Sequence, residues 1–249
     1  MEIKVIEELC KKLRLFNIKE SLQERLKQAQ QDAIGYSEFL SLILQDELQI
    51  RQAKQLAAKI KQAQFEEEKT FESLDSKIFP DKIQRILREI RTLGFLLDKK
   101  NVIIMGPTGT GKSHVAQALG FQACRQGKSV RFIRAHQLYR LLCAARADDT
   151  WEKKFKYFMR LDVVIIDDFG LKSLDHQQAD DLYELIAERH NKGGLIFTSN
   201  RRIDAWVKLF PDPVMSNAAL DRLANTSYQI VLEGDSYRRK MRPNQKEVN

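Results

Sequence analysis

The order of hydrophobic and polar positions changes once along the chain, and each part predicts a different kind of structure. In residues 1–68 apolar side chains recur three and four positions apart, which is the spacing of one helix face. Gly35 interrupts this pattern, and Ser37 is placed to cap the helix that follows. The three apolar groups are Val5, Ile6, Leu9 and Leu13; Leu22, Leu26 and Ala29; and Phe39, Leu40, Ile43, Leu44 and Leu48.

The end of this first part predicts a connecting helix. Residues 50–69 are rich in Ala, Gln, Lys and Glu, which favour helix, but their apolar face is thin. We therefore expect a small all-helical N-terminal domain over residues 1–68, suited to contact with a partner or with DNA. A helix-turn-helix DNA reader is compatible with these helices, although their spacing does not require one.

After about residue 98, short β-rich runs alternate with amphipathic stretches. This alternation predicts βαβ units, and hence an α/β fold with a parallel five-stranded sheet between helices. Several runs are continuously apolar, as strands buried on both faces are. The expected strands are 101–105, 129–134, 162–167, 194–199 and 227–232, and the expected helices are 112–126, 136–146, 151–160, 176–192 and 203–225.

Composition narrows the class of protein. Of 249 residues 43% are hydrophobic, so a sizeable core can form, and the three cysteines are too few and too far apart for a disulfide scaffold. No apolar run is long enough to cross a bilayer, and residues 1–16 mix acids and bases without an apolar stretch. We expect a cytoplasmic protein with no membrane partner.

The basic excess is unevenly distributed. Residues 1–80 carry 13 basic and 14 acidic side chains, whereas residues 81–249 carry 29 and 20, so the net charge of +8 belongs to the second part. A basic surface of this size is suited to a polyanion, although it also serves solubility alone.

The strand at 101–105 leads into the strongest motif of the chain. The sequence GPTGTGKS has the G-x-x-x-x-G-K-[ST] pattern of a phosphate loop, with a strand before it and a helix after it. Its glycines allow successive N–H groups to surround a phosphate, Lys112 can reach the β- and γ-phosphates, and Ser113 can ligate Mg²⁺. We expect ATP to be held by Gly106, Pro107, Thr108, Gly109, Thr110, Gly111, Lys112, Ser113 and His114.

Two acids and an amide follow the next buried runs. Asp167 ends an apolar strand, where acids are rare unless paired or metal-bound, so we expect it to hold Mg²⁺ together with Ser113. Asp168 is placed to orient and deprotonate the attacking water, and Asn200, after the strand at 194–199, to hydrogen-bond the γ-phosphate or that water. A guanine-reading N-K-x-D motif is not formed at Asn191, since the aspartate is missing.

Together the segments GPTGTGKS, VVIIDDFG, IFTSN and AALDRL resemble the AAA+ ATPases of the DnaA/DnaC clade. Over residues 69–240 the chain is most similar to the IstB-like ATP-binding proteins, which assist the transposition of insertion sequences. The resemblance implies an AAA+ domain over residues 69–249, with an ASCE-type sheet whose sensor strand lies between the phosphate-loop strand and the acid-bearing strand. It also implies rings or helical oligomers in which one subunit completes the site of its neighbour.

The resemblance also implies roles for single residues. Lys112 and Ser113 match the Walker A pair, Asp167 the Walker B acid, and Asn200 the sensor 1 position. Arg222 resembles the arginine finger that reaches the adjacent γ-phosphate; the alternative is a surface arginine paired with Asp221. Arg238 or Arg239 is a weaker match to sensor 2.

One departure from the family concerns the hydrolytic base. Many members have Glu where this chain has Asp168, and the shorter side chain favours slow, switch-like turnover.

Residues 135–160 carry basic side chains interleaved with aromatic ones, in a region that lines the DNA channel in the resembled clade. We expect Lys153, Lys154 and Lys156 to contact DNA, while Phe155 and Phe158 are equally suited to the core.

Three functions are compatible with the sequence. The first is an ATPase that oligomerises on double-stranded DNA and recruits or stimulates a transposase, and the second is a DnaC-like replicative helicase loader. The third is a DNA-binding assembly module that uses ATP only as a ligand. Preference for duplex over single-stranded DNA separates the first two, and hydrolysis separates both from the third.

Overall fold

The computed structural model describes residues 2–234, and the chain divides into two units, Met1–Ala58 and Lys59–Asn249. The sequence prediction placed this boundary after residue 68. Each unit is described by itself below. Among residues 2–234, no helix combines the length and the apolar composition needed to cross a membrane.

The first unit is helical, as predicted. It contains α1 (Glu2–Lys12), α2 (Ile18–Gln31) and the first part of α3 (Tyr36–Ala63). Its core consists of Ile18, Leu22 and Ile43, with Leu26 and Phe39 among the partly buried residues packed against them.

Two local predictions for α3 are wrong. The helix begins at Tyr36, so Ser37 lies inside its first turn and does not cap it. It ends at Ala63 and not at residue 69, because Gln64 takes a left-handed conformation with φ of 55°.

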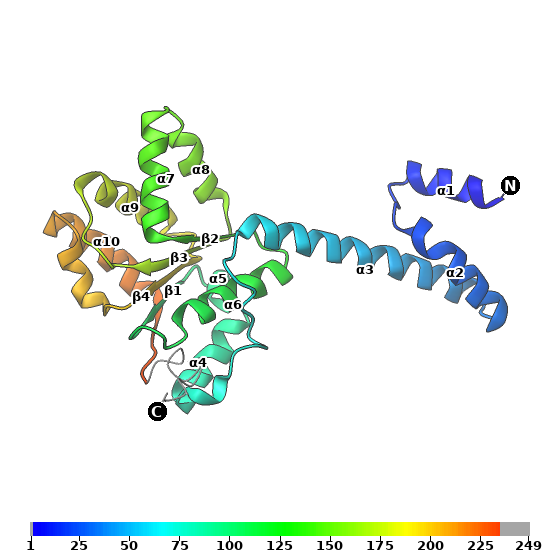
Figure 1. Ribbon diagram of the computed structural model, residues 1–249, viewed down its shortest axis with the longest axis horizontal. Coiled ribbons are helices and arrows are strands. Elements are labelled where there is room, and N and C mark those ends of the chain that lie inside the picture. Colours follow the sequence, from blue (N-terminus) through cyan, green and yellow to red (C-terminus); the bar gives the residue numbers. More distant parts are fainter. Residues whose placement is uncertain (1, 235–249) are drawn as a thin grey trace, which may run out of the picture. The chain divides into compact units, whose positions relative to one another are not determined.

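The second unit is built on a five-stranded parallel sheet (Figure 1). The strands lie in the order β2-β3-β4-β1-β5, and every neighbouring pair is parallel. The predicted sensor strand is β4. It lies between the phosphate-loop strand β1 and the acid-bearing strand β3, so the predicted ASCE order is confirmed. The bounds are β1 (Asn101–Met105), β2 (Val130–Arg134), β3 (Val163–Phe169), β4 (Leu195–Ser199) and β5 (Ser227–Val231).

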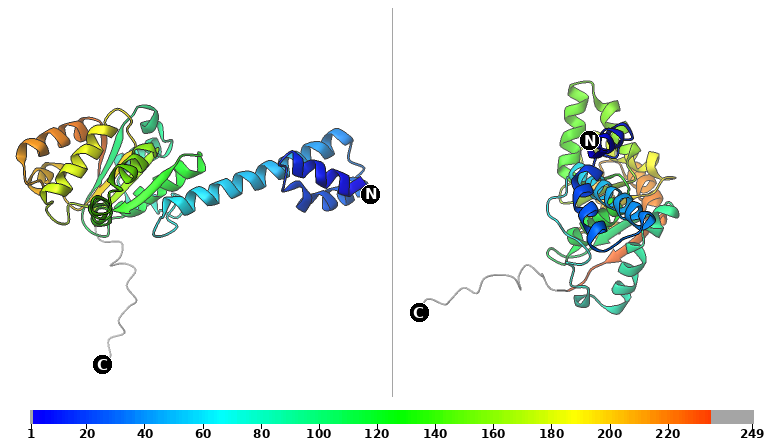
Figure 2. Two further views of the ribbon diagram at one scale, coloured as in Figure 1. Left: turned by 90° about the horizontal axis from the view of Figure 1, so that it is seen from above. Right: turned by 90° about the vertical axis from the view of Figure 1, so that its right-hand side faces the viewer.

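Helices cover both faces of this sheet (Figure 2). Alternate strand side chains point to opposite faces, so Ile103, Ile166 and Phe197 share a core with α7, α8, α9 and α10. On the other face, α6 packs so closely that a Cβ on its Gly120 would lie 2.7 Å from Ile165. The helices of this unit are α4 (Asp81–Arg91), α5 (Gly94–Leu97), α6 (Lys112–Arg125), α7 (Ala135–Ala147), α8 (Trp151–Arg160), α9 (His176–Arg189) and α10 (Pro213–Asn225), with 3₁₀ turns η1 (Ser76–Ile78) and η2 (Ile203–Leu209).

The predicted helix over residues 203–225 is divided into two pieces. Residues 203–209 form the 3₁₀ turn η2, and α10 starts anew at Pro213. Asp212 caps α10 by accepting a 2.8 Å hydrogen bond from the N–H of Val214. Pro213 fits the first helical position, because a residue there needs no N–H donor within the helix. After the break, α10 packs against α9, which matters for Arg222 below.

Candidate nucleotide-binding site

The phosphate loop connects β1 to α6 at the carboxyl edge of the sheet, where ligands bind in open parallel sheets. Two of its glycines are required by geometry. Gly106 has φ of 147°, and a Cβ there would lie 2.1 Å from the carbonyl oxygen of Leu232. Gly111 has φ of 92° and forms the N-cap of α6, so the helix N-terminus points its free N–H groups into the loop.

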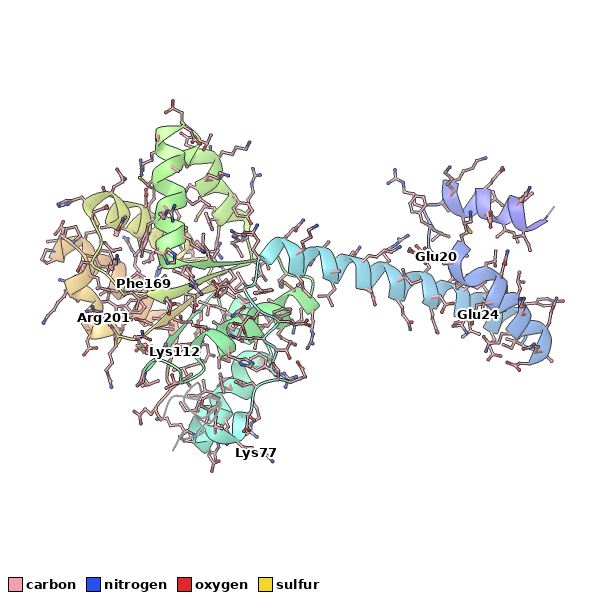
Figure 3. All side chains as sticks on the ribbon, viewed as in Figure 1. Glu20, Glu24, Lys77, Lys112, Phe169 and Arg201 are labelled. Atoms are coloured by element: carbon pink, nitrogen blue, oxygen red, sulfur yellow. The ribbon has the colours of Figure 1, made fainter. Side chains whose placement is uncertain are left out.

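Lys112 begins α6 and is 5% exposed (labelled in Figure 3). Its Nζ donates a 2.8 Å hydrogen bond to the carbonyl of Pro107, and the hydroxyl of Thr110 donates to the same carbonyl at 2.9 Å. These bonds fold the loop around the lysine, so the ammonium group lies within the arc of backbone that is expected to surround a phosphate. The remaining expected ligands, Thr108 and Gly109, belong to the same arc, Gly109 with φ of 87°.

The two acids lie at an irregularity in β3. Ile166 pairs with Phe197 and Phe169 with Ser199, so Asp167 and Asp168 together oppose Thr198 alone. This is a β-bulge, a device that re-aims side chains at the end of a strand. The hydroxyl of Thr198 donates to Oδ1 of Asp167 at 2.5 Å and accepts the N–H of Asp168 at 3.0 Å. A fully buried threonine therefore fixes both acids.

Asp167 is 2% exposed, and burial raises its pKa above the usual aspartate value. Hydrogen bonds from Thr198 and Ser113 act in the opposite direction and favour the carboxylate, while the charge of Asp168 raises the pKa further. The bond to Ser113 places a hydroxyl and a carboxylate side by side, next to Lys112 in the sequence of the phosphate loop. Both are hard oxygen donors, so this pair fits Mg²⁺, which retains waters and phosphate oxygens as its other ligands.

Asp168 has φ of 56°, in the left-handed region. Aspartate occupies this region more readily than most residues, since its short side chain bonds locally to the backbone. Its side chain is half-buried, in contrast to the buried Asp167 next to it. The bulge thus gives the two acids different environments, which is what different roles require.

His114 faces a segment that precedes the sheet. Its Nε2 lies 2.9 Å from the carbonyl of Thr70 and 3.2 Å from the hydroxyl of Ser73, and burial lowers its pKa. On the same segment Glu72 pairs with Arg91 at 2.8 Å and Arg125 at 3.1 Å. These contacts hold residues 70–73 against both ends of α6, and the ring of His114 is taken up by contacts within the protein.

Three residues near the site were missed by the sequence interpretation. Arg134 ends β2 opposite Asp167 in the strand register, and its guanidinium pairs with Glu66 at 2.6 Å. The charge of Glu66 contributes to the raised pKa of Asp167. Thr198 belongs to the segment IFTSN, in which the sequence interpretation gave a role only to Asn200. The signal that could have found it is its position near the end of a strand. Because β4 lies next to β3, that position brings Thr198 into contact with the acids.

The other predicted residues lie on other elements of the second unit. Asn200 directly follows β4 and is exposed at the same edge of the sheet. Figure 3 labels Phe169, the last residue of β3, and Arg201, which follows β4 by two positions. A Cβ on Gly170 would lie 3.7 Å from the Arg201 side chain. Arg222 lies on α10 and bonds to Tyr183, while Asp221 accepts from Asn225, so the alternative pairing of Arg222 with Asp221 is wrong. The sensor 2 candidates Arg238 and Arg239 lie outside the described residues.

The lysines expected to meet DNA are exposed on α8, which lies beside α7 (Figure 1). Phe155 and Phe158 of the same helix are 6% and 1% exposed, so they belong to the core. Lys156 pairs with Glu152 at 3.0 Å. A basic cavity of about 600 Å³ on this face is lined by Arg146, Asp149, Trp151, Glu152, Lys153, Lys156 and Arg160.

The parallel sheet, the phosphate loop and the acid-bearing strand define a P-loop nucleotide-binding protein of the AAA+ class. The sequence profile of the family described as IstB-like ATP binding protein matches residues 8–245, and the chain belongs to that family.

Relatives agree with this assignment. The chain is 39% identical over 232 residues to an insertion-sequence protein of Mycobacterium tuberculosis named for ATP binding, covering 93% of this chain and 92% of that one. A relative from Geobacillus stearothermophilus, named for ATP binding in the insertion sequence IS5376, is 35% identical, with 94% and 93% covered.

Two solved structures share the fold. The crystal structure of DnaI aligns with a TM-score of 0.59 at 19% identity, over 67% of this chain and 92% of that one. The DnaC helicase loader aligns with a TM-score of 0.54 at 18% identity, over 61% and 89%.

Proposed function

We propose that this protein is a DNA-binding ATPase that oligomerises on double-stranded DNA and recruits or stimulates a transposase. The observation that carries the catalytic part is the bulge in β3, which sets buried Asp167 beside Ser113 and leaves Asp168 half-buried directly after it. Family membership and relatives named for insertion sequences support the role in transposition.

The residues divide the work of hydrolysis between them. The loop N–H groups and Lys112 bind the phosphates of ATP, and Ser113 with Asp167 would hold Mg²⁺. The metal supplies charge neutralisation at the phosphates when bound. Asp168 accepts the proton of the attacking water, and Asn200 orients that water or the γ-phosphate. Aspartate reaches less far than glutamate, so we infer slow turnover suited to a switch.

Oligomerisation gives Arg222 its role. Within residues 2–234 it forms no ion pair, so its charge is available to a γ-phosphate of a neighbouring subunit. An arginine supplied in this way raises phosphoryl-transfer rates by about 10³-fold or more.

DNA binding is assigned to the exposed face of α8. Lys153, Lys154 and Lys156 project from a helix whose aromatic residues Phe155 and Phe158 are anchored in the core, so the charges are held on a fixed support. Lysines bind phosphates through charge, which gives sequence-tolerant and salt-dependent affinity.

The test measures duplex binding with and without ATP over a range of salt concentrations. We expect ATP-dependent binding that falls steeply with salt, and the triple change of Lys153, Lys154 and Lys156 to Glu should lower affinity on all sequences alike. The control carries the same charge change at three exposed lysines elsewhere on this unit, Lys99, Lys192 and Lys208.

The outcomes separate the alternatives. Unchanged binding by the α8 variant would move the DNA site to the basic side chains of α4, which are Lys82, Arg85, Arg88 and Arg91. Preference for single strands would favour the DnaC-like helicase loader. Binding without any ATP turnover would favour an assembly module. Capture of the transposase of the same insertion sequence by the full chain, but not by a chain lacking residues 1–58, would identify the first unit as its contact.

A further inference from the structure

Arg222 of α10 is held by a neutral side chain of α9. Its Nη1 donates a 2.8 Å hydrogen bond to the hydroxyl of Tyr183, and its guanidinium carbon lies 5.3 Å from the centre of the same ring. Tyr183 in turn packs against the main hydrophobic core, so its ring has a fixed support. One aromatic residue therefore restrains the guanidinium both through its face and through its hydroxyl.

The choice of partner has an electrostatic consequence. A carboxylate at this place would neutralise Arg222, and Asp221 is adjacent in sequence, yet Asp221 accepts a 2.7 Å bond from Asn225 instead. Tyrosine fixes the orientation of the guanidinium and leaves its positive charge uncompensated. Arg222 is also only partly buried, so the rest of its fork of donors is accessible from outside the subunit.

We propose that Tyr183 is a positioning residue that orients the guanidinium of Arg222 toward the γ-phosphate bound by a second copy of this chain. This proposal rests on the proposed role of Arg222 as an arginine finger. A long side chain loses rotamer freedom when it enters a neighbouring site, and a finger that is already restrained loses less. In this proposal Tyr183 acts on hydrolysis only through Arg222.

The test uses mixed oligomers, in which the finger and the pocket come from different variants. An acceptor subunit carries Arg222→Ala, so it has an intact pocket and no finger. A donor subunit carries Lys112→Ala, so it has an intact finger and a pocket that cannot bind ATP. Hydrolysis in the mixture then reports on donor fingers reaching acceptor pockets. Mixed assembly is measured separately, by co-purification of differently tagged subunits.

The variant of interest places Tyr183→Phe in the donor. Phenylalanine keeps the ring and removes the hydroxyl, so we expect the restored hydrolysis rate to fall about 3- to 10-fold, the effect of one hydrogen bond. Tyr183→Leu removes the ring as well and should reduce the rate further. The ATP affinity of the acceptor pocket should not change, because the acceptor is unmodified at Tyr183. The yield of mixed oligomer should not change with Tyr183→Phe, because the hydroxyl that it removes bonds to Arg222.

Two controls separate positioning from a structural role. The same Tyr183→Phe change placed in the acceptor should leave the rate unchanged, because the acceptor has no finger. If the change merely destabilised the subunit, it would lower the rate in the acceptor as well as in the donor. Tyr228→Phe in the donor removes another tyrosine hydroxyl of the same unit, one that bonds to Glu89 at 2.9 Å, and should have no effect on the restored rate.

The results distinguish this inference from the function on which it rests. If the unmodified donor restores no hydrolysis although mixed oligomers form, the finger role of Arg222 is wrong. If it restores hydrolysis and Tyr183→Phe in the donor leaves the rate unchanged, Arg222 is a finger that Tyr183 does not position. A faster rate would mean that Tyr183 holds the finger away from its target, which also overturns the proposal.

Discussion

The two units of the chain differ most in how they bury apolar side chains. In the described part of the first unit, the buried apolar residues are Ile18, Leu22 and Ile43. In the second unit the strands β1 and β4 are buried at every position, and helices cover both faces. The first unit instead exposes the stripe that the sequence assigns to a helix face: Val5, Ile6, Leu9 and Leu13 are 40–68% exposed.

This difference shows how far a hydrophobic pattern can be interpreted. A stripe at helical spacing predicts a helix in both units, and α1 confirms it. In the second unit the chain itself covers such faces, and in the first unit it covers part of α2 and α3 but leaves the α1 stripe exposed. A small helical unit with an exposed stripe has little core to stabilise it and much surface for contact, whereas the second unit holds chemical groups in fixed positions.

The largest expected effect concerns the fixed groups of the second unit. Lys112→Ala should abolish detectable ATP binding, a loss of at least about 100-fold in affinity, because it removes the cation within the phosphate loop. Titration with a fluorescent ATP analogue measures the affinity. Thermal unfolding without nucleotide verifies that the variant is folded.

Asp168→Asn is the matched control for this prediction. It changes charge at the same edge of the sheet, but its proposed role is hydrolysis, so ATP should remain bound while turnover stops. Wild-type affinity in Lys112→Ala would contradict the assignment of the phosphate loop. An affinity loss in Asp168→Asn as large as that of Lys112→Ala would make Asp168 a binding residue.

Most of the second unit could be predicted because strands and phosphate loop are local signals. The strand over residues 101–105 has the predicted bounds, and the other four agree within two residues at each end. The prediction of one helix over residues 203–225 was wrong, because the two prolines at 211 and 213 interrupt an otherwise helical pattern. Propensity alone does not show where such a break falls.

The site could be predicted only in part, because some of its contacts depend on sheet order. Lys112, Ser113 and Asp167 belong to motifs that the sequence shows directly. Thr198 touches both acids only because β4 lies next to β3 and a bulge shifts the register. The contact of Arg222 with Tyr183 joins two helices 39 positions apart, and no spacing rule connects them.

A pair of matched core substitutions tests whether the two units are energetically separate. Leu185 of α9 and Leu22 of α2 are 1% and 4% exposed. Leu185→Ala should lower the free energy of unfolding of the second unit by about 2–5 kcal/mol, because it leaves a cavity in a large rigid core. Leu22→Ala should cost less, since a three-residue core can collapse around the missing atoms.

Calorimetry with and without an ATP analogue distinguishes the two transitions, because a ligand stabilises only the unit that binds it. We expect Leu185→Ala to lower the temperature of the ATP-sensitive transition, and Leu22→Ala to leave that transition where it is. An equal shift from Leu22→Ala would show that the chain unfolds as one cooperative block, and the comparison between the units would then have no energetic meaning.

The smallest effect is expected at the exposed stripe of the first unit. Leu13 follows α1 and is 68% exposed, so Leu13→Gln should change the free energy of unfolding by no more than about 0.5 kcal/mol in urea titration. Leu22→Gln, the same change at a buried position, should cost several times more, since it buries an amide without a partner. If Leu13→Gln instead destabilised the unit as much as Leu22→Gln, the stripe would be covered by this chain or by another copy of it in solution. The expected small effect would mean that the apolar residues of α1 contribute little to folding and are available for contact with a partner.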